Sequence, residues 1–439
     1  MPAKPKTAKV TAVNDLKVNL VIPLIAAIIG IAAGYMYIFL RASLGFLQNI
    51  FLQNQIAFTP IGYENHILGY WFLVLPPIAF VFIAAFIKVF DADSFGAALP
   101  GILQSEANNK QYSFTWRGIF VRGFAAVFTI ASGGSVGKEG PLAYMAASLS
   151  QKITNIIRLD KDQKRLLLIC GIAAGISASL NTPLAAIVLA LELFLKKLRI
   201  ESFFPILISS FFACLVARAT YGQSLEFLIP TFHLQSSLEI VFYIGLGLIA
   251  GLYSSAIKQI YKGIYQGFAK TNIHYLWKAL FGGLIISAFG FFFPQSLGLG
   301  VNTLVESLRG QTLATVVLAL FFAKPILMAV SLHCGGSGGL IWPLLFIGAL
   351  MGATYGIGLQ HYFPTIVLNY GPYALVGMAA FFAATSRASF SAAVLLIELT
   401  LDYSLILPLI LACIIAEQIA ILLKSPSIFL LPIKSKDKN

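Results

Sequence analysis

Charged residues are scarce in this chain of 439 residues. Asp, Glu, Lys and Arg together make up 11% of it, whereas hydrophobic residues make up 58%. Several long stretches hold no charged residue at all: 18–40, 65–87, 166–191, 240–257, 279–305 and 325–386. A helix needs roughly 20 apolar residues to cross a bilayer. The composition therefore excludes an ordinary soluble protein and predicts an all-α polytopic membrane protein.

Cysteine and histidine are also scarce, and neither is grouped like metal ligands. The four cysteines lie in apolar segments without CxxC spacing, which indicates buried small side chains rather than disulfides or ligands. The five histidines are scattered without metal spacing. His333 is interpreted as a buried structural imidazole, with a titrating group as the alternative. With no nucleophile–base pair and no phosphate-binding loop either, we expect no metal, no cofactor and no enzyme.

The net charge of +13 is unevenly distributed. Basic residues gather at both ends of the chain and in 152–165 and 196–199, without the aromatic interleaving of a nucleic-acid surface. Positively charged loops stay in the cytoplasm, so both termini are predicted to be cytoplasmic. The first apolar run has no evident cleavage site, which indicates an anchor rather than a signal peptide. The compact architecture suggests a multi-pass protein of a prokaryotic inner membrane.

Two glycine-rich stretches, 132–141 and 334–343, repeat each other at an offset of 202 residues. The matching positions of the first copy are Gly133, Gly134, Ser135, Gly137 and Pro141, and those of the second are Gly335, Gly336, Ser337, Gly339 and Pro343. Glycine lets the backbone approach a ligand closely, and a proline just inside a helix start is shaped for the first turn. Each copy therefore predicts an unwound segment that leads into a helix N-terminus, where N–H groups and the dipole favour an anion. The alternative is tight helix packing through small residues.

A second repeat relates residues 171–193 to residues 377–399 at the similar offset of 206. Both repeats fit one internal duplication, so we predict two repeats of membrane helices with re-entrant or broken helices. If the copies are inverted, both glycine-rich helix starts can point at the membrane midplane. The Gly/Pro segment 91–101 is a further re-entrant candidate. The predicted organisation is a cytoplasmic segment 1–17, a first membrane half 18–217, a connecting loop 218–238, a second half 239–424 and a short cytoplasmic tail 425–439, without a soluble regulatory domain.

Four motifs, taken in order, resemble those of the CLC family of chloride channels and proton-coupled chloride transporters. Residues 137–141 match G-[KR]-E-G-P, 339–343 match G-x-F-x-P with Ile341 in the Phe position, and 96–100 match G-S-G-I-P loosely. Residues 377–403 are close to the family's version, and the resemblance covers roughly residues 20–430. It implies a CLC-type homodimer in the lipid membrane, in which each subunit has its own anion pathway between two inverted halves; chloride and protons are the expected ions. Another inverted-repeat transporter is the alternative.

Glu139 is the main candidate for coupling. An ionised carboxylate at membrane depth costs about 2.5–3.5 kcal/mol on insertion scales, and such residues usually mark ion or proton paths. Near helix N-termini its carboxylate can occupy a chloride position, which it vacates when protonated. The resemblance makes it the external gating glutamate, and the alternative is a structural acid paired with Lys138. Glu192 and Glu398 are interpreted as helix-end structural acids, with a proton relay as the alternative.

The resemblance also implies the residues that bind the anion and shows where this chain departs from the family. The expected positions are Ala97, Gly137, Lys138, Gly140, Gly339, Leu340, Ile341 and Phe429, with backbone N–H groups of Leu340 and Ile341 as donors. Ala97 and Phe429 stand where the family has serine and tyrosine hydroxyls, so we predict weak central affinity and poorer discrimination among anions. Under a shifted alignment, Ser427 supplies a hydroxyl instead.

The inner proton acceptor of the family's transporters is commonly an acid in the position that Leu193 holds here. Its absence weakens the expectation of coupling, whereas Glu139 supports it. We predict proton-coupled chloride antiport, with a passive voltage- or pH-gated chloride channel as the alternative.

Overall fold

The computed structural model describes residues 20–52, 71–108, 112–157, 159–195, 200–222 and 238–431, together with residues 232 and 236. Within this part, eight helices are long and apolar enough to cross a membrane. The chain is therefore an all-α polytopic membrane protein, as the lack of charge predicted. The predicted segment 1–17 lies outside the described residues.

The first half of the chain contains long helices that alternate with short elements. In order they are α2 (Ile22–Leu52), α3 (Trp71–Phe90), η2 (Ala92–Ser94), β1 (Gly96–Ala97), α4 (Ala98–Ala107), α5 (Trp116–Ala131), α6 (Glu139–Ile156), α7 (Lys161–Leu180), α8 (Pro183–Ala190), the π-helical η3 (Leu191–Leu195) and α9 (Ile200–Tyr221).

The second half repeats the succession of helices but not the position of the strand. It contains α10 (Glu239–Lys270), α11 (Tyr275–Phe292), η4 (Pro294–Ser296), α12 (Val301–Arg309), α13 (Ala314–His333), β2 (Ser337–Gly338), α14 (Ile341–Tyr362), α15 (Gly371–Ser386), α16 (Ser389–Thr400), α17 (Ile406–Leu422) and η5 (Ile428–Leu430).

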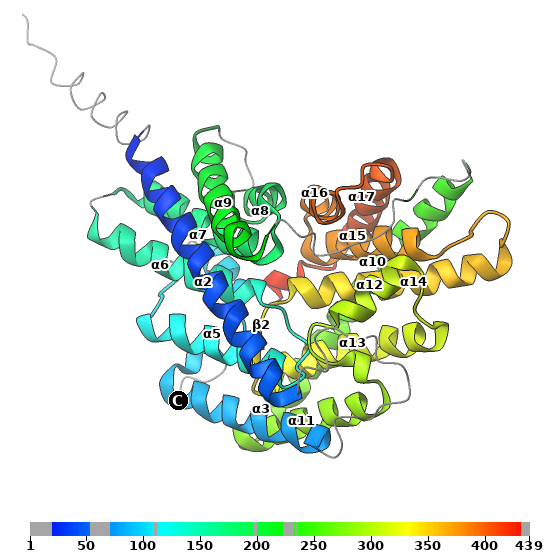
Figure 1. Ribbon diagram of the computed structural model, residues 1–439, viewed down its shortest axis with the longest axis horizontal. Coiled ribbons are helices and arrows are strands. Elements are labelled where there is room, and N and C mark those ends of the chain that lie inside the picture. The colour runs from blue at the N-terminus through cyan, green and yellow to red at the C-terminus, as the bar shows by residue number, and fades with distance from the viewer. Residues whose placement is uncertain are drawn as a thin grey trace, which may run out of the picture.

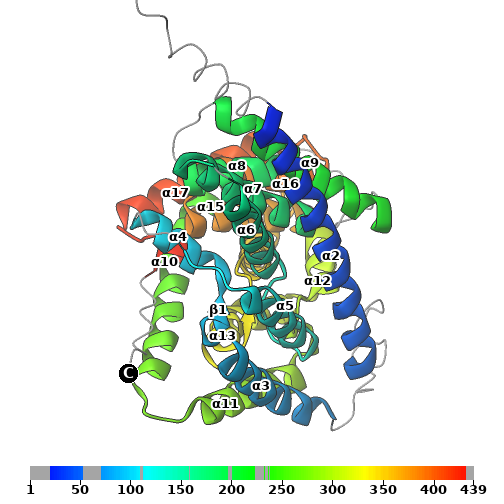
Figure 2. The same ribbon diagram turned by 90° about the vertical axis from the view of Figure 1, so that its left-hand side faces the viewer.

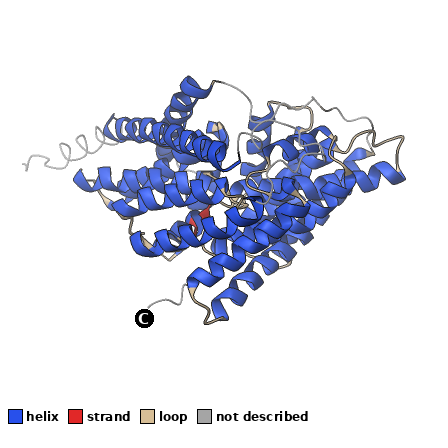
Figure 3. Cartoon of the chain, turned by 60° about the horizontal axis from the view of Figure 1, so that its bottom comes forward, coloured by secondary structure: helices blue, strands red, loops and turns tan. Residues whose placement is uncertain are grey.

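The packing of the helices follows the same repeat. Helix α7 packs against α2, α6 and α9, and its counterpart α15 packs against α10, α14 and α17. The halves meet where α3 packs on α11 and where α8 packs on α16, at opposite ends of the molecule (Figure 1; Figure 2). The two short strands β1 and β2 pair in parallel between the halves, surrounded by helices (Figure 3). These contacts place the duplicated glycine-rich segments at the centre of the fold.

Glycines at equivalent positions allow the helices to pack closely. A Cβ atom on Gly171 would lie 2.7 Å from the carbonyl oxygen of Ala146, and one on Gly377 would lie 2.6 Å from the Cα atom of Gly352. Helix α7 therefore touches the backbone of α6, and α15 touches that of α14. Small residues at helix contacts are typical of membrane proteins.

Two of the predicted boundaries differ from the structure. Helix α9 continues to Tyr221, beyond the predicted loop start at 218, because Arg218 donates to Asn181 Oδ1 (2.7 Å) and so fixes the last turn. The predicted tail is not free at its beginning, since Ile428 and Phe429 are fully buried in η5. Most of the predicted loop after residue 222, and residues 432–439, lie outside the described part of the chain.

Candidate anion pathway

The two glycine-rich loops contact each other through their backbones. The N–H of Gly137 donates to the carbonyl of Gly339 (2.8 Å), and the N–H of Gly339 donates back to the carbonyl of Gly137 (2.6 Å). A Cβ atom on Gly140 would lie 2.9 Å from the Cα atom of Gly339. Glycine is required at these positions because a side chain would separate the loops.

Reciprocal hydrogen bonds hold each loop to the other half. The N–H of Ser135 donates to Ser331 Oγ (3.0 Å), and the N–H of Ser337 donates to Thr129 Oγ1 (3.2 Å). Each hydroxyl comes from the helix that leads into the opposite loop, α13 in one case and α5 in the other. The two loops are therefore fixed relative to each other.

The helices that follow the loops begin beside this contact. The first helical hydrogen bond of α6 joins Leu142 N–H to Lys138 C=O (3.2 Å), and that of α14 joins Leu344 N–H to Leu340 C=O (3.1 Å). In both helices the third residue is a proline, as the repeat predicted. Two positive dipole ends thus lie at the same place, which favours negative charge there.

Glu139 lies between the two loops. It is the first residue of α6 and is fully buried. Its Oε2 atom occupies the space that a Cβ atom on Gly137 would need, and it would lie 3.2 Å from a Cβ atom on Gly339. The Nζ atom of Lys138 lies 5.4 Å from the ring centre of Tyr37. The carboxylate thus occupies a position suited to an anion, and the neighbouring ammonium faces an aromatic ring.

Ala97 and Phe429 approach this centre from other elements. Ala97 pairs with Gly338 in the register of β1 and β2, which brings it beside the second loop. Phe429 is fully buried in η5, which packs on α4 and α15. The hydroxyl of Ser427 donates to the carbonyl of Ser386 (2.8 Å), so its single proton is already used. The Ser427 hydroxyl therefore has a backbone partner in this structure, and the alternative in which it donates to the anion stays a prediction.

Glu192 and Glu398 cap helices of the opposite half. Glu192, in η3, accepts the N–H of Ser391 at the start of α16 (2.8 Å). Glu398, in α16, accepts the N–H of Ala185 at the start of α8 (2.8 Å). The helix-end role predicted for both is the one that this geometry supports. That each caps the other half was not predicted, because it depends on how α8 and α16 pack together.

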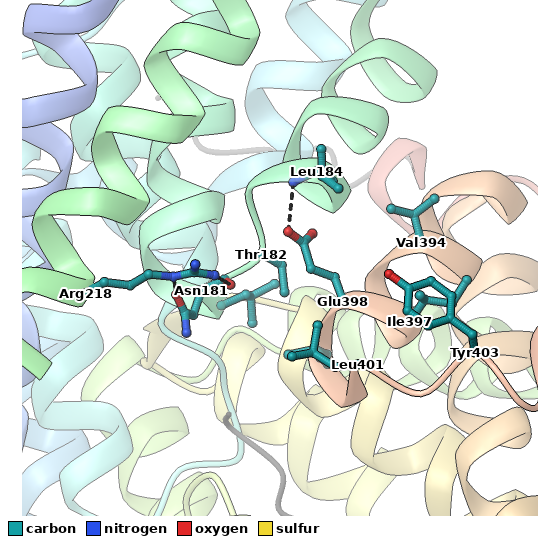
Figure 4. A pocket seen from close by; sticks show the side chains of 11 residues that line it. Asn181, Thr182, Leu184, Arg218, Val394, Ile397, Glu398, Leu401 and Tyr403 are labelled. Atoms are coloured by element: carbon teal, nitrogen blue, oxygen red, sulfur yellow. Dashed lines mark hydrogen bonds between the residues drawn. The ribbon is translucent and has the colours of Figure 1, made fainter. Parts of the chain in front are cut away.

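A cavity of about 240 Å³ adjoins the capped start of α8. Figure 4 shows Glu398 pointing at the backbone of Leu184, with Arg218 and Asn181 on the other side of the space. The lining residues are Leu180, Asn181, Thr182, Leu184, Arg218, Val394, Ile397, Glu398, Leu399, Leu401 and Tyr403. None of them belongs to the glycine-rich loops, so this cavity is separate from the candidate anion centre.

Of the remaining candidate ligands, His333 is partly buried and the four cysteines are buried. The ring of His333 packs 4.6 Å from that of Tyr261 and 5.1 Å from that of Tyr265, which agrees with a structural imidazole. All four cysteines are buried and free. Among the described residues, no group of three His, Cys, Asp or Glu side chains is arranged to hold a metal ion.

Comparison with known proteins agrees with this arrangement. The model of the voltage gated chloride channel family matches residues 78–420. The chain belongs to this family, the CLC proteins. The H(+)/Cl(-) exchange transporter ClcA of Vibrio parahaemolyticus is 28% identical to it, over 92% of this chain and 88% of that protein. The voltage-gated ClC-type chloride channel ClcB of Escherichia coli is also 28% identical, over 92% of this chain and 97% of that protein.

The solved structures of CLC proteins share the fold. The crystal structure of a slow cyanobacterial Cl-/H+ antiporter matches with a TM-score of 0.82 at 21% identity, over 94% of this chain and 97% of that chain. This CLC chain is therefore a multi-pass membrane protein of an anion-transporting family, whose members are channels or transporters rather than enzymes.

Proposed function

We propose that this CLC protein exchanges chloride for protons across the membrane and that Glu139 carries the proton. The observation that carries the proposal is the position of the Glu139 carboxylate, beside Gly137 and Gly339, at the N-termini of α6 and α14. One place favours both this carboxylate and a chloride ion. The two anions therefore compete for it.

Protonation decides which anion occupies the site. The ionised carboxylate is attracted by both helix dipoles and excludes chloride. The neutral acid loses this attraction, leaves the loops and admits chloride in its place. Binding of a proton and binding of chloride are then linked, because each stabilises the same rearranged state. Alternation between the two states exchanges the ions in opposite directions.

The names of related proteins support exchange without excluding conduction. The Vibrio relative is named an H(+)/Cl(-) exchange transporter, and the cyanobacterial structure is that of a Cl-/H+ antiporter. The Escherichia coli relative is named a chloride channel. Leu193 favours this second function, since an apolar residue stands where the family's transporters commonly carry an acid. A passive channel is therefore the alternative candidate.

The expected anion contacts are mainly backbone groups. In this proposal the donors are N–H groups of Leu340 and Ile341 and the backbone around Gly137, Lys138 and Gly140. Ala97 and Phe429 contribute no hydroxyl, so central chloride binding is weak. By analogy with the family we also propose a homodimer in a prokaryotic inner membrane with both termini in the cytoplasm.

The test is proton movement in vesicles that contain only the purified protein and a chloride gradient. Wild type is expected to move protons uphill, and Glu139→Gln, which keeps the size of the side chain but cannot ionise, is expected to abolish this movement. Chloride flux without proton movement in wild type would make the protein a channel. Proton movement that survives in Glu139→Gln would remove Glu139 from the mechanism.

A further inference from the structure

Glu192 and Glu398 occupy equivalent positions in the two halves but have different surroundings. Their backbone contacts are nearly the same. Glu192 accepts N–H groups of Phe390 (3.2 Å) and Ser391 (2.8 Å), and Glu398 accepts those of Leu184 (3.1 Å) and Ala185 (2.8 Å). Both carboxylates therefore cap a helix in the same way, and the differences between them lie in their other neighbours.

The first difference is a hydroxyl. Ser391 donates its Oγ–H to Glu192 Oε2 in addition to its N–H. The equivalent residue beside Glu398 is Ala185, which has no hydroxyl. A hydroxyl can donate to an ionised carboxylate and accept from a protonated one, so it suits a carboxyl group that changes state.

The second difference is the sign of the neighbouring charge. Arg218 acts on Glu398, and Figure 4 shows both residues on the same cavity. Glu417, on α17, acts on Glu192. A cation holds a carboxylate in its ionised form, whereas a second carboxylate favours uptake of a proton. The two capping acids thus differ in the sign of the charge that acts on them.

Two cations lie in the same region, and Arg387 is one on which the charge of Glu417 also acts. Arg165 forms a salt bridge with Glu106 (2.7 Å) and donates to the carbonyl of Phe194 (3.2 Å). Arg387 donates to the backbone carbonyls of Glu417 and Ser425. Cys413 of α17 is buried in the same region, near both carboxylates. Residues 196–199 lie outside the described part of the chain.

Helix η3 lies between the segment that holds Ala97 and the basic stretch that holds Arg165. It packs against α4, the helix that begins directly after Ala97. Its last residues lie beside Arg165, in the basic stretch that is predicted to face the cytoplasm. A carboxylate on η3 thus lies on the inner side, where a proton released by Glu139 has to leave.

We propose that Glu192 accepts the inner proton in place of the acid that Leu193 replaces. The inference rests on the proposed antiport. The carboxylate of Glu192 binds the proton that leaves Glu139, becomes a neutral acid hydrogen-bonded to Ser391, and then releases the same proton to cytoplasmic water. The carboxylate is restored, and chloride does not pass through this group.

The test compares Glu192→Gln with Glu398→Gln in vesicles of pure protein under a chloride gradient. Glu192→Gln is expected to lower proton flux about 100-fold or more while chloride flux continues, because loss of a proton-transferring group typically costs 10²–10⁴-fold. Glu398→Gln loses an equivalent cap and is expected to keep proton coupling. Equal proton-to-chloride ratios in Glu192→Gln and wild type would overturn the proposal.

A second variant covers the case in which Glu192→Gln fails to fold. Glu417→Gln removes the neighbouring carboxylate and keeps the cap, so proton flux is expected to need a lower pH than in wild type. An unchanged pH profile would contradict the role of Glu192. If wild type itself moves no protons, the proposed antiport fails together with this inference; if wild type pumps and Glu192→Gln pumps equally, only this inference fails.

Discussion

At the scale of single residues, the missing hydroxyl at Ala97 gives a direct test of the anion centre. Hydrogen bonds to charged groups contribute about 1.5–3 kcal/mol, which corresponds to roughly tenfold or more in affinity. Ala97→Ser is therefore expected to tighten chloride binding by about that factor, measured by isothermal titration calorimetry. Ala97→Cys, similar in size but with only a weak S–H donor, is the control and should change affinity little.

The two possible outcomes have different meanings. Tighter binding in the serine variant alone places Ala97 beside the anion and explains weak binding in wild type. Equal chloride affinities in all three proteins would show that the central site does not lie beside β1. Tight chloride binding in wild type would contradict the prediction of weak binding.

Residues whose roles follow from local chemistry could be identified in the sequence, and residues whose roles depend on packing could not. Glu139 stands out because an acid beside glycines in an apolar stretch is rare, and the structure places it between the loops. The bond from Ser427 to Ser386 joins residues 41 positions apart, and no local pattern indicates it. The same is true of the charge beside Glu192, which comes from Glu417 on another helix.

At the scale of elements, the bonds between each loop and the opposite half predict a cost for removing one hydroxyl. Thr129→Val keeps the shape of the side chain but leaves the buried N–H of Ser337 without its acceptor. An unpaired buried group costs about 1–3 kcal/mol, so we expect a lower Tm for the variant in detergent solution.

Thr385→Val is the matched control for this experiment. The Thr385 hydroxyl is equally buried but donates only to carbonyls of its own helix, those of Phe381 (2.7 Å) and Phe382 (3.1 Å). Removing this hydroxyl leaves no N–H of another segment without an acceptor, so Tm should fall less than in Thr129→Val. Equal losses in both variants would show that the bond between the halves adds nothing to stability.

The repeat of elements was predicted, but their exact ends were not. Glycine and proline at a constant offset indicated two broken helices, and α5–α6 and α13–α14 confirm them. The last turn of α9 and the buried η5 were assigned to loop and tail, because their order depends on Arg218 meeting Asn181 and on Phe429 packing beneath α4 and α15. Tertiary contacts decide element ends that propensity leaves open.

At the scale of the whole molecule, the duplication extends to buried cations. Arg122 and Lys324, 202 positions apart, are both buried and lie over aromatic rings at the same offset, Tyr144 at 4.5 Å and Phe346 at 4.8 Å. Each also donates to backbone carbonyls in the turn before a short helix, α4 or α12. The two halves are therefore built in the same way. Because they are inverted repeats, the ends of equivalent helices should lie on opposite faces of the membrane.

The second half shows which ends lie on opposite faces. Helix α15 runs from Gly371, beside α12, to its last turn, where Lys258 of α10 donates to the carbonyl of Ala384 (3.2 Å). Helix α10 continues for twelve residues beyond Lys258, about 18 Å of helix. Thr271 follows α10 and lies beyond the last turn of α15, whereas Gln311 follows α12, which lies at the start of α15. The two residues are therefore at opposite ends, and both are exposed.

The end that holds Thr271 is also the basic one. Ser427 joins the last residue of α15 to the C-terminal segment, and Gln104 of α4 donates to the carbonyl of Leu431 in that segment (2.7 Å). The same helix carries Glu106, which binds Arg165 in the basic stretch. Because basic loops stay in the cytoplasm, this end is predicted to face inward.

Labelling with a membrane-impermeant maleimide tests this orientation in whole cells. Gln311→Cys is expected to react from outside, and Thr271→Cys only after the membrane is permeabilised. Wild type is the control, since its four cysteines are buried and should give little background. The reverse pattern would place the basic end outside, and Glu192 would then lie on the outer side of Glu139, where it could not receive a proton on its way into the cell.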